Sequence, residues 1–244
     1  MQQTDLTIVS NRRISGGTYE MVLAGDTSAI TAPGQFIDLR LEGFYLRRPI
    51  SVCDRDETTV TILYKPLGKG TNAMTAFAPG KVLDVLTGLG NGFDVSRSGE
   101  KPLLVGGGVG IAPLYLLAKE LIRAGREVTA VLGYNTKDDI FYAEELERLG
   151  VRVIVTTADG SFGIPGFVTD GMKQLSGYSY LYTCGPEPML RAVYDACGSD
   201  GEFSFEERMG CGFGACMGCT CETKYGAKRI CRDGPVLRKE EIVW

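Results

Sequence analysis

The sequence predicts a multidomain α+β protein built from three parts. They are an N-terminal antiparallel β-barrel at 1–97, a central doubly wound α/β domain at 98–202 and a small cysteine-rich module at 203–244. Three observations predict this division. Short β-rich runs fill residues 4–90, strand and helix patterns then alternate, and five of the eight cysteines lie between residues 211 and 231. A polar, charged stretch at 96–101 separates the first two parts and is typical of a domain linker.

The predicted barrel rests on runs of β-branched or alternating residues, at 6–9, 18–23, 35–41 and 58–64. Gly-Gly, Pro-Gly and Glu-Gly pairs interrupt these runs and indicate turns. Several short strands at this spacing favour a small barrel. Three glycines close it, Gly88, Gly90 and Gly92, and we expect them to let backbone approach a ligand.

A basic strand lies inside the predicted barrel. Arg47 and Arg48 begin the run Arg-Arg-Pro-Ile-Ser, and arginine can bind a pyrophosphate bidentately. Downstream, Gly70 and Thr71 precede a helical pattern at 72–77, with Thr71 as the expected N-cap beside a phosphate. From these residues alone, a barrel surface with unrelated basic residues and a turn stays open as the alternative.

The central part changes to a repeating strand–helix pattern. Strands are expected at 102–105, 128–132, 151–155 and 179–182, and helices at 111–124, 144–149 and 187–196. Such alternation predicts parallel βαβ units, whose ligands bind at the carboxyl ends of the strands. Two turns lie there, at 106–113 and 183–189. The first lacks the G-x-G-x-x-G spacing, and both could also be tight packing turns.

The cysteines of the C-terminal module have the spacing C-x4-C-x2-C-x11-C, formed by Cys211, Cys216, Cys219 and Cys231. This resembles the plant-type [2Fe-2S] ligand pattern, and the intervening glycines allow backbone N–H groups to point at the sulfurs. A zinc site usually uses paired C-x2-C knuckles, and only one is present. Disulfides would need an oxidising compartment. Zinc and disulfide readings remain as alternatives.

The other cysteines receive a structural interpretation. Cys221 lies two residues after Cys219, so a strand leaving the loop would point both side chains to one face, and we expect it to be packed and not a ligand. Cys53, Cys184 and Cys197 are scattered and are expected to be small buried groups. A hairpin turning at Gly226 would bring Cys231 back to the loop.

Composition excludes several function classes. The chain contains no histidine, which excludes Ser-His-Asp and Cys-His catalysis, Rieske centres and His-ligated haem. A net charge of −4 gives no electrostatic case for binding nucleic acid or an anionic membrane. The uncharged run at 102–118 is broken by glycines and prolines, and the N-terminus is polar. We therefore expect a cytoplasmic protein whose chemistry comes from cofactors.

Taken together, the barrel and nucleotide motifs resemble those of the ferredoxin–NAD(P)+ reductase superfamily. That resemblance implies FAD in the barrel, bound by Arg48, Pro49, Ile50, Ser51, Leu63, Tyr64, Lys65, Gly70 and Thr71. It implies a nicotinamide nucleotide at the two turns, bound by Gly107, Gly108, Gly110, Cys184, Gly185 and Pro186. One lysine and two aspartates at 137–139 favour NAD(H) over NADP(H).

The C-terminal cysteine arrangement is similar to that of the electron-transfer subunits of NAD-linked dihydroorotate dehydrogenases. The resemblance implies that Cys211, Cys216, Cys219 and Cys231 hold the [2Fe-2S] cluster. It implies a partner, an FMN-containing catalytic subunit, in a heterotetramer of two copies each. Electrons would pass from that FMN through the cluster and FAD to NAD+, in pyrimidine biosynthesis. The chain itself offers no base to deprotonate dihydroorotate, so no catalytic residue is expected on it.

Two other classes of function remain open at this stage. One is a subunit of another flavin and iron–sulfur NAD(P)H oxidoreductase, of the ferredoxin:NADP+ oxidoreductase or sulfide dehydrogenase type. Those relatives tend to place a carboxylate where this chain has Cys211, which argues against them. The other is a non-enzymatic, zinc-bearing binding module.

Overall fold

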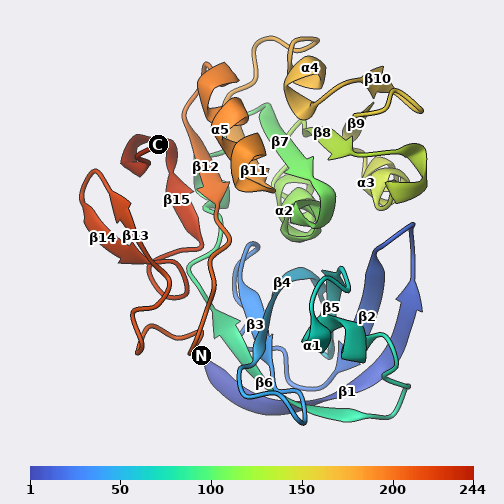
Figure 1. The fold of residues 1–244 in the computed structure, drawn as a ribbon. Helices are drawn as coiled ribbons and strands as arrows, with labels where there is room; N and C mark the ends of the chain where they lie inside the picture. The colour runs from blue at the N-terminus through green and yellow to red at the C-terminus, as the bar shows by residue number, and fades with distance from the viewer.

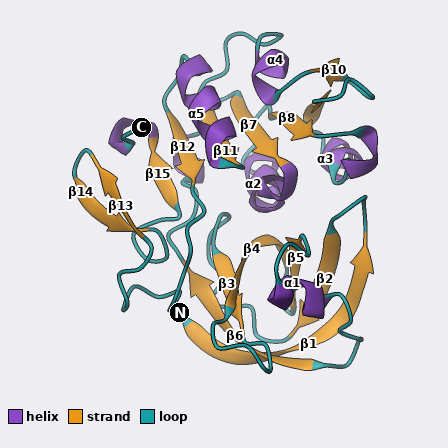
Figure 2. Ribbon diagram, viewed as in Figure 1, coloured by secondary structure: helices purple, strands orange, loops and turns teal.

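The computed structural model describes all 244 residues and contains a barrel, a parallel sheet and a two-stranded hairpin (Figures 1 and 2). The predicted fold class is confirmed. The barrel is closed and antiparallel, in the order β1-β2-β5-β4-β3-β6. Its strands are β1 (Gln2–Arg13), β2 (Tyr19–Ala24), β3 (Phe36–Leu39), β4 (Arg48–Arg55), β5 (Thr59–Tyr64) and β6 (Val82–Leu89).

Alternation along these strands builds the barrel core. Leu6 and Ile8 of β1 are buried, as are Met21 and Leu23 of β2, because side chains two apart on a strand share a face. Helix α1 (Lys69–Met74) inserts Met74 into the same core. This helix starts earlier than the sequence predicted, so the expectation that Thr71 is its N-cap was wrong.

The second sheet has seven strands, in the order β10-β9-β8-β7-β11-β12-β15. They are β7 (Pro102–Gly107), β8 (Thr129–Tyr134), β9 (Arg152–Thr157), β10 (Ile164–Pro165), β11 (Tyr180–Cys184), β12 (Gly201–Ser204) and β15 (Val236–Arg238). All neighbours are parallel except β12 and β15. The short strand β15 comes from beyond the cysteines, so the C-terminal module completes this seven-stranded sheet, which is the sheet of the predicted nucleotide domain and is called the nucleotide sheet below. The domain boundaries at 97/98 and 202/203 remain predictions.

Helices cover both faces of this sheet. On the barrel side, α2 (Ala112–Arg123) and α3 (Ala143–Arg148) share a core with Leu104 and Leu132 of the sheet. On the other side, α4 (Val168–Met172) and α5 (Glu187–Ala196) pack on Val105, Val131 and Leu181. Figure 1 shows α2 lying between the sheet and the barrel. No helix has the length and apolar character needed to cross a membrane.

Polar contacts fix the barrel against the nucleotide sheet. Lys119 of α2 pairs with Asp54 of β4, with Nζ 2.6 and 2.8 Å from the two carboxylate oxygens. The Tyr142 hydroxyl donates to Oε2 of Glu20 in β2 at 2.9 Å. Tyr142 has φ of 61°, an uncommon value for a residue with a side chain. That backbone turn carries its side chain to the domain interface.

The C-terminal module is anchored to the end of β6. The Asn91 side chain donates to the carbonyl of Val236 at 2.8 Å and accepts from its N–H at 3.1 Å. A Cβ on Gly90 would lie 2.5 Å from Pro235. A Cβ on Gly88 would lie 2.3 Å from the carbonyl oxygen of Ala29. A Cβ on Gly92 would lie 2.7 Å from the carbonyl oxygen of Pro33. These glycines therefore admit the chain itself, and our expectation that they also admit a ligand stays a prediction.

The cysteine segment folds as a loop followed by a hairpin, β13 (Thr220–Thr223) and β14 (Gly226–Arg229) (Figure 1). Thr223 pairs with Gly226, so the turn is formed by Lys224 and Tyr225 and not by Gly226 as the sequence suggested. The hairpin returns the chain to the loop as expected, because Cys231 then donates its N–H to Cys219 Sγ at 3.4 Å.

Candidate cofactor sites

Arg48 and Gly70, far apart in sequence, lie against each other. A Cβ on Gly70 would be only 2.2 Å from Nε of Arg48, so glycine is required for this approach. The guanidinium donates to the carbonyls of Leu46 at 2.6 Å and Arg47 at 3.1 Å, and lies over the Phe44 ring. A cation beside a glycine at a helix start suits a pyrophosphate, so an FAD pyrophosphate fits these residues.

The rest of the basic strand is half-buried. Pro49, Ile50 and Ser51 keep partial exposure in the middle of a closed barrel, which leaves a strip where a ligand can contact β4. Thr71 is the third residue of α1, and its hydroxyl is used locally, accepting from the Gly68 N–H at 3.1 Å. The assignment of these residues to FAD stays a prediction.

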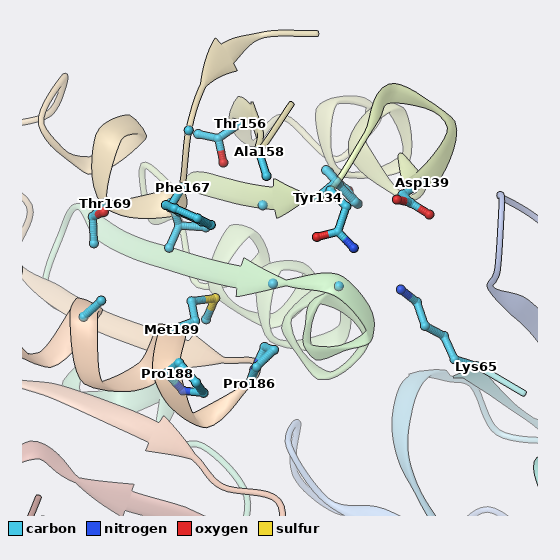
Figure 3. Close-up of a pocket in the computed structure, with 17 residues that line it drawn as sticks. Lys65, Tyr134, Asp139, Thr156, Ala158, Phe167, Thr169, Pro186, Pro188 and Met189 are labelled. Carbon is cyan, nitrogen blue, oxygen red and sulfur yellow. The ribbon is translucent and has the colours of Figure 1, made fainter. Parts of the chain in front are cut away.

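Leu63, Tyr64 and Lys65 point in different directions. Leu63 is buried in the core shared with the nucleotide sheet. Tyr64 is buried in the barrel, where its ring stacks on Tyr19 and its hydroxyl donates to Asn11 at 2.8 Å. Backbone groups are therefore what Leu63 and Tyr64 can offer a flavin. Lys65 instead reaches a separate cavity (Figure 3).

That cavity, of about 520 Å³, lies at the carboxyl ends of β7, β8 and β9 (Figure 3). Of the predicted residues, Gly107, Gly108 and Pro186 line it directly. This is the position where parallel sheets bind nucleotides. A dinucleotide fits its mixture of glycine backbone, apolar side chains and few charges.

The two predicted turns form one packed unit beneath the cavity. A Cβ on Gly110 would be 2.4 Å from the Cys184 carbonyl oxygen. A Cβ on Gly107 or Gly185 would be 2.4 or 2.5 Å from the Met189 side chain, respectively. Burial raises the pKa of the Cys184 thiol to about 12, so it is neutral at physiological pH. Cys184 therefore belongs to the floor and is no thiolate nucleophile.

Several cavity residues escaped the sequence analysis, among them Thr156, Ala158 and Phe167. Phe167 is the most informative, because its side chain stays 70% exposed at the cavity (Figure 3). Its position after Gly-Ile-Pro-Gly, where α4 begins, was the available signal. An exposed aromatic ring beside a nucleotide cavity offers a surface for stacking a base.

The four predicted cluster cysteines form two pairs. Cys211 Sγ accepts the N–H of Cys216 at 3.4 Å, and also that of Ala215 at 3.2 Å. Cys219 and Cys231 form the second pair, and both are buried. Two pairs suit two irons better than one tetrahedral zinc, so a [2Fe-2S] cluster fits these residues.

Loop geometry turns backbone N–H groups toward sulfur. Gly212, Gly214 and Met217 have φ of 78°, 91° and 60°, respectively. Burial raises the pKa of the Cys211 thiol, but the N–H groups of Cys216, Phe213 and Ala215 outweigh it and lower that pKa to about 6. At Cys231, burial and the neighbouring Cys219 thiol raise the pKa to about 12. Bound iron would supply the positive charge that keeps the buried Cys231 thiol deprotonated.

Cys221 lies on β13 opposite Lys228 and packs at the edge of the apolar core. It makes no hydrogen bond to the four cysteines. Its exclusion from the ligand set is consistent with this packing and stays a prediction.

Asp38 is a further residue that the sequence did not single out. It lies on β3 beneath the cysteine loop, where a Cβ on Gly212 would be 2.5 Å from its Oδ2. Its Oδ1 has no hydrogen-bond partner. Burial raises the pKa of this carboxyl to about 7, although nearby Arg47 opposes the shift. A buried carboxyl thus stands between the flavin barrel and the cysteine loop.

A barrel with an Arg48–Gly70 site, followed by a parallel nucleotide sheet, defines a ferredoxin–NADP reductase-like oxidoreductase. The chain superposes on a structure of NADH-dependent reduced ferredoxin-NADP oxidoreductase with a TM-score of 0.90, at 32% identity, covering 98% of this chain and 90% of the other. A ferredoxin NADP+ reductase from Neisseria gonorrhoeae shares the fold alone, with a TM-score of 0.69 at 17% identity, over 80% of this chain and 90% of that one.

The full sequence narrows this class to one family. Residues 206–243 match the iron-sulfur cluster binding domain of dihydroorotate dehydrogenase B, and residues 104–195 match the oxidoreductase NAD-binding domain. The electron transfer subunit of dihydroorotate dehydrogenase B (NAD(+)) from Geobacillus sp. (strain WCH70) is 42% identical, over 100% of this chain and 99% of its own. That from Fusobacterium nucleatum subsp. nucleatum is also 42% identical, over 99% of each chain. The chain belongs to this family of electron transfer subunits.

Proposed function

We propose that this chain is the electron transfer subunit of an NAD-linked dihydroorotate dehydrogenase. The cofactors of this function are FAD, a [2Fe-2S] cluster and NAD(H). The observation that carries the proposal is the pairing of Cys211 with Cys216 and of Cys219 with Cys231, on a chain that also has the barrel and the nucleotide cavity. When bound, FAD exchanges a two-electron hydride for the single electrons that the cluster carries.

The residues that we propose for FAD fall into three groups, according to the kind of contact that each can make. Contact between Arg48 and Gly70 supports Arg48 as the pyrophosphate ligand, with Gly70 leaving the space and Thr71 at the same helix start. Half-exposure supports Pro49, Ile50 and Ser51 as contacts along β4. Leu63 and Tyr64 would contribute backbone, because their side chains pack elsewhere.

The residues proposed for NAD(H) have two tasks. Gly107, Gly108 and Pro186 line the cavity and let the dinucleotide approach the backbone closely. Gly110, Cys184 and Gly185 hold the two turns together beneath it. Asp139, at the edge of the cavity, supports NAD over NADP, because a carboxylate accepts a ribose hydroxyl and repels a 2′-phosphate.

We also propose a separate catalytic partner that carries FMN, in a heterotetramer of two copies of each chain. The chain has no histidine, and the thiol of Cys184, beneath the cavity, is neutral, which supports placing the base for dihydroorotate on a separate chain. The cysteine loop offers the partner a surface, since Phe213 and Met217 remain 42% and 54% exposed. None of the eight cysteines forms a disulfide, which supports the cytoplasm as the location.

A second candidate is a subunit of a ferredoxin-linked NAD(P)H oxidoreductase, favoured by the structural likeness to such a protein. One experiment separates the two. The chain is purified without oxygen, alone and with an FMN-containing dihydroorotate dehydrogenase subunit from the same cell. Dihydroorotate-dependent formation of NADH by the complex supports the first proposal. A complex that forms no NADH from dihydroorotate, while the chain reduces ferredoxin with NAD(P)H, contradicts it.

A further inference from the structure

The segment at 90–101, which joins β6 of the barrel to β7 of the nucleotide sheet, is held by both domains (Figure 1). On the barrel side, Phe93 donates its N–H to the carbonyl of Pro33 at 2.7 Å, and a Cβ on Gly34 would lie 2.8 Å from its ring. On the other side, the Phe93 ring meets the ring of Tyr182 in β11 edge-on, with centroids 5.6 Å apart. Phe93 therefore packs against both domains at once.

The peptide groups of Asp94, the next residue, bond to two side chains of the nucleotide sheet. Glu202 Oε2 on β12 accepts the Asp94 N–H at 2.9 Å, and the Tyr182 hydroxyl donates to the Asp94 carbonyl at 2.7 Å. Glu202 and Tyr182 are register partners on neighbouring strands, so their side chains leave the sheet on the same face. Both are buried. A buried group that loses its partner is costly, so these two bonds hold the segment on the sheet.

The cysteine module meets the same segment. Its strand β15 pairs with β12, where Arg238 lies opposite Glu202. Asn91 donates its backbone N–H to the carbonyl of Gly234 at 2.7 Å, in addition to its two side-chain bonds to β15. Residues 91–94 therefore contact the barrel, the nucleotide sheet and the cysteine module, and they are called the joint below.

The joint lies between the domains that hold the two cofactors in the proposed function. Hydride transfer requires reacting atoms about 3–3.5 Å apart, and a displacement of about 1 Å can slow it about 100-fold. With FAD in the barrel and NAD(H) on the sheet, this separation depends on how the two domains are joined. Tyr182 is also two residues before Cys184, on the strand that ends at the cavity floor. A shift of β11 at the joint would therefore move the turn at 183–189.

We propose that Glu202 and Tyr182 are positioning residues for hydride transfer, which act by holding the joint on the nucleotide sheet. The inference rests on the proposed function, because it takes the barrel as the FAD site and the cavity as the NAD(H) site. Neither residue lines that cavity. Their loss should therefore slow the reaction of bound NADH with FAD and leave the binding of NADH unchanged.

The test compares Glu202→Ala, Glu202→Gln and Tyr182→Phe with the control Glu147→Ala, which changes an exposed glutamate on α3. Each is prepared as FAD-loaded holoprotein, and FAD per chain is measured by absorbance. Anaerobic stopped-flow reduction by a series of NADH concentrations gives the limiting rate constant and the apparent Kd separately. Hydrogen–deuterium exchange of the Asp94 amide reports on the joint itself. The pH is held at about 6, because burial raises the pKa of Glu202 to about 7 and glutamine then matches its neutral form.

We expect Glu202→Ala to lower the limiting rate constant at least about tenfold, to keep the apparent Kd within about twofold and to speed exchange at Asp94. Glu202→Gln should restore the rate to within about threefold of the native protein, because its amide oxygen still accepts the Asp94 N–H. Tyr182→Phe keeps the ring contact with Phe93 and loses one hydrogen bond, so its rate should fall by about threefold or more. Glu147→Ala should match the native protein.

Unchanged limiting rate constants in Glu202→Ala and Tyr182→Phe overturn the inference, as does a loss that appears only in Kd or that glutamine does not restore. If Glu202→Ala does not fold or does not retain FAD, Tyr182→Phe decides by the same measurements. A native holoprotein whose FAD is not reduced by NADH overturns the proposed function instead, so the two failures are distinguishable.

Discussion

Replacing Gly110 with alanine tests whether the two glycine turns form one nucleotide site. The new Cβ would lie 2.4 Å from the carbonyl oxygen and 2.6 Å from the carbonyl carbon of Cys184. Both atoms are backbone, so no rotamer change can relieve the contact. Gly110 lies in a short 3-10 helix and has no left-handed φ, so the effect of the alanine is one of space.

The size of the effect follows from this overlap. Non-bonded carbon atoms prefer about 3.5–4.0 Å, so the turns at Gly110 and Cys184 must separate by about 1 Å. Overpacking of this kind lowers the free energy of unfolding by about 1–3 kcal/mol. The higher helix propensity of alanine offsets up to about 1 kcal/mol of this loss. For a chain of this length, a cost of about 1 kcal/mol lowers Tm by about 2–4 °C. Misplacement by about 1 Å can slow hydride transfer about 100-fold.

The assay is anaerobic reduction of bound FAD by NADH, followed by stopped-flow absorbance, together with thermal melting. Gly198→Ala is the matched control, because its Cβ would meet nothing within 4 Å. We expect slow FAD reduction and a lower Tm in Gly110→Ala, and neither in Gly198→Ala. If Gly110→Ala reduces FAD as fast as the control and melts at the same temperature, the reasoning about this close approach is refuted.

Three other predictions concern the cluster, a buried carboxyl and the domain interface. Cys216→Ser should lose the [2Fe-2S] absorbance and electron paramagnetic resonance signal, while NADH still reduces the FAD; loss of both would contradict separate sites. Burial raises the pKa of Glu202 from 4.5 to about 7, so between pH 4.5 and 7 the folded chain holds a proton that the unfolded chain releases. The contribution of Glu202 to the free energy of unfolding therefore falls by up to about 3 kcal/mol as pH rises from 4.5 to 7. The Glu202→Gln variant, unfolded in urea across this pH range, should not show that decrease. Tyr142→Phe removes the bond to Glu20, which should cost about 1–3 kcal/mol and lower Tm; an unchanged Tm would exclude this bond as a domain anchor.

Much of the fold was predictable because local patterns and tertiary structure agree. Alternating apolar and polar residues in β1 and β2 indicated the barrel. Leu114, Leu117 and Leu121 have helical spacing, which indicated α2, and all three are buried. The cluster spacing was equally readable, since a short loop must bring its cysteines together. Strand β15 could not be predicted from the sequence. It has only three residues and no alternating pattern around it, so it becomes a strand only because it pairs with β12.

Side-chain direction was the part of the site that sequence could not supply. Leu63, Tyr64 and Lys65 are consecutive, yet they face the shared core, the barrel interior and the nucleotide cavity. A motif assigns all three to one ligand, whereas the arrangement of two domains decides where each points. The same limit applies to Phe167 and Asp38, which matter because distant elements converge on them.

The most direct test of the central claim is the transfer of electrons from dihydroorotate to NAD+. The chain is combined with the FMN-containing partner that we propose, under anaerobic conditions, and NADH and orotate are measured together. We predict equal amounts of NADH and orotate from the complex, none from this chain alone, and loss of NADH formation when Cys216→Ser replaces the native chain. NADH formation that continues at the native rate with Cys216→Ser would contradict the proposed route through the cysteine loop.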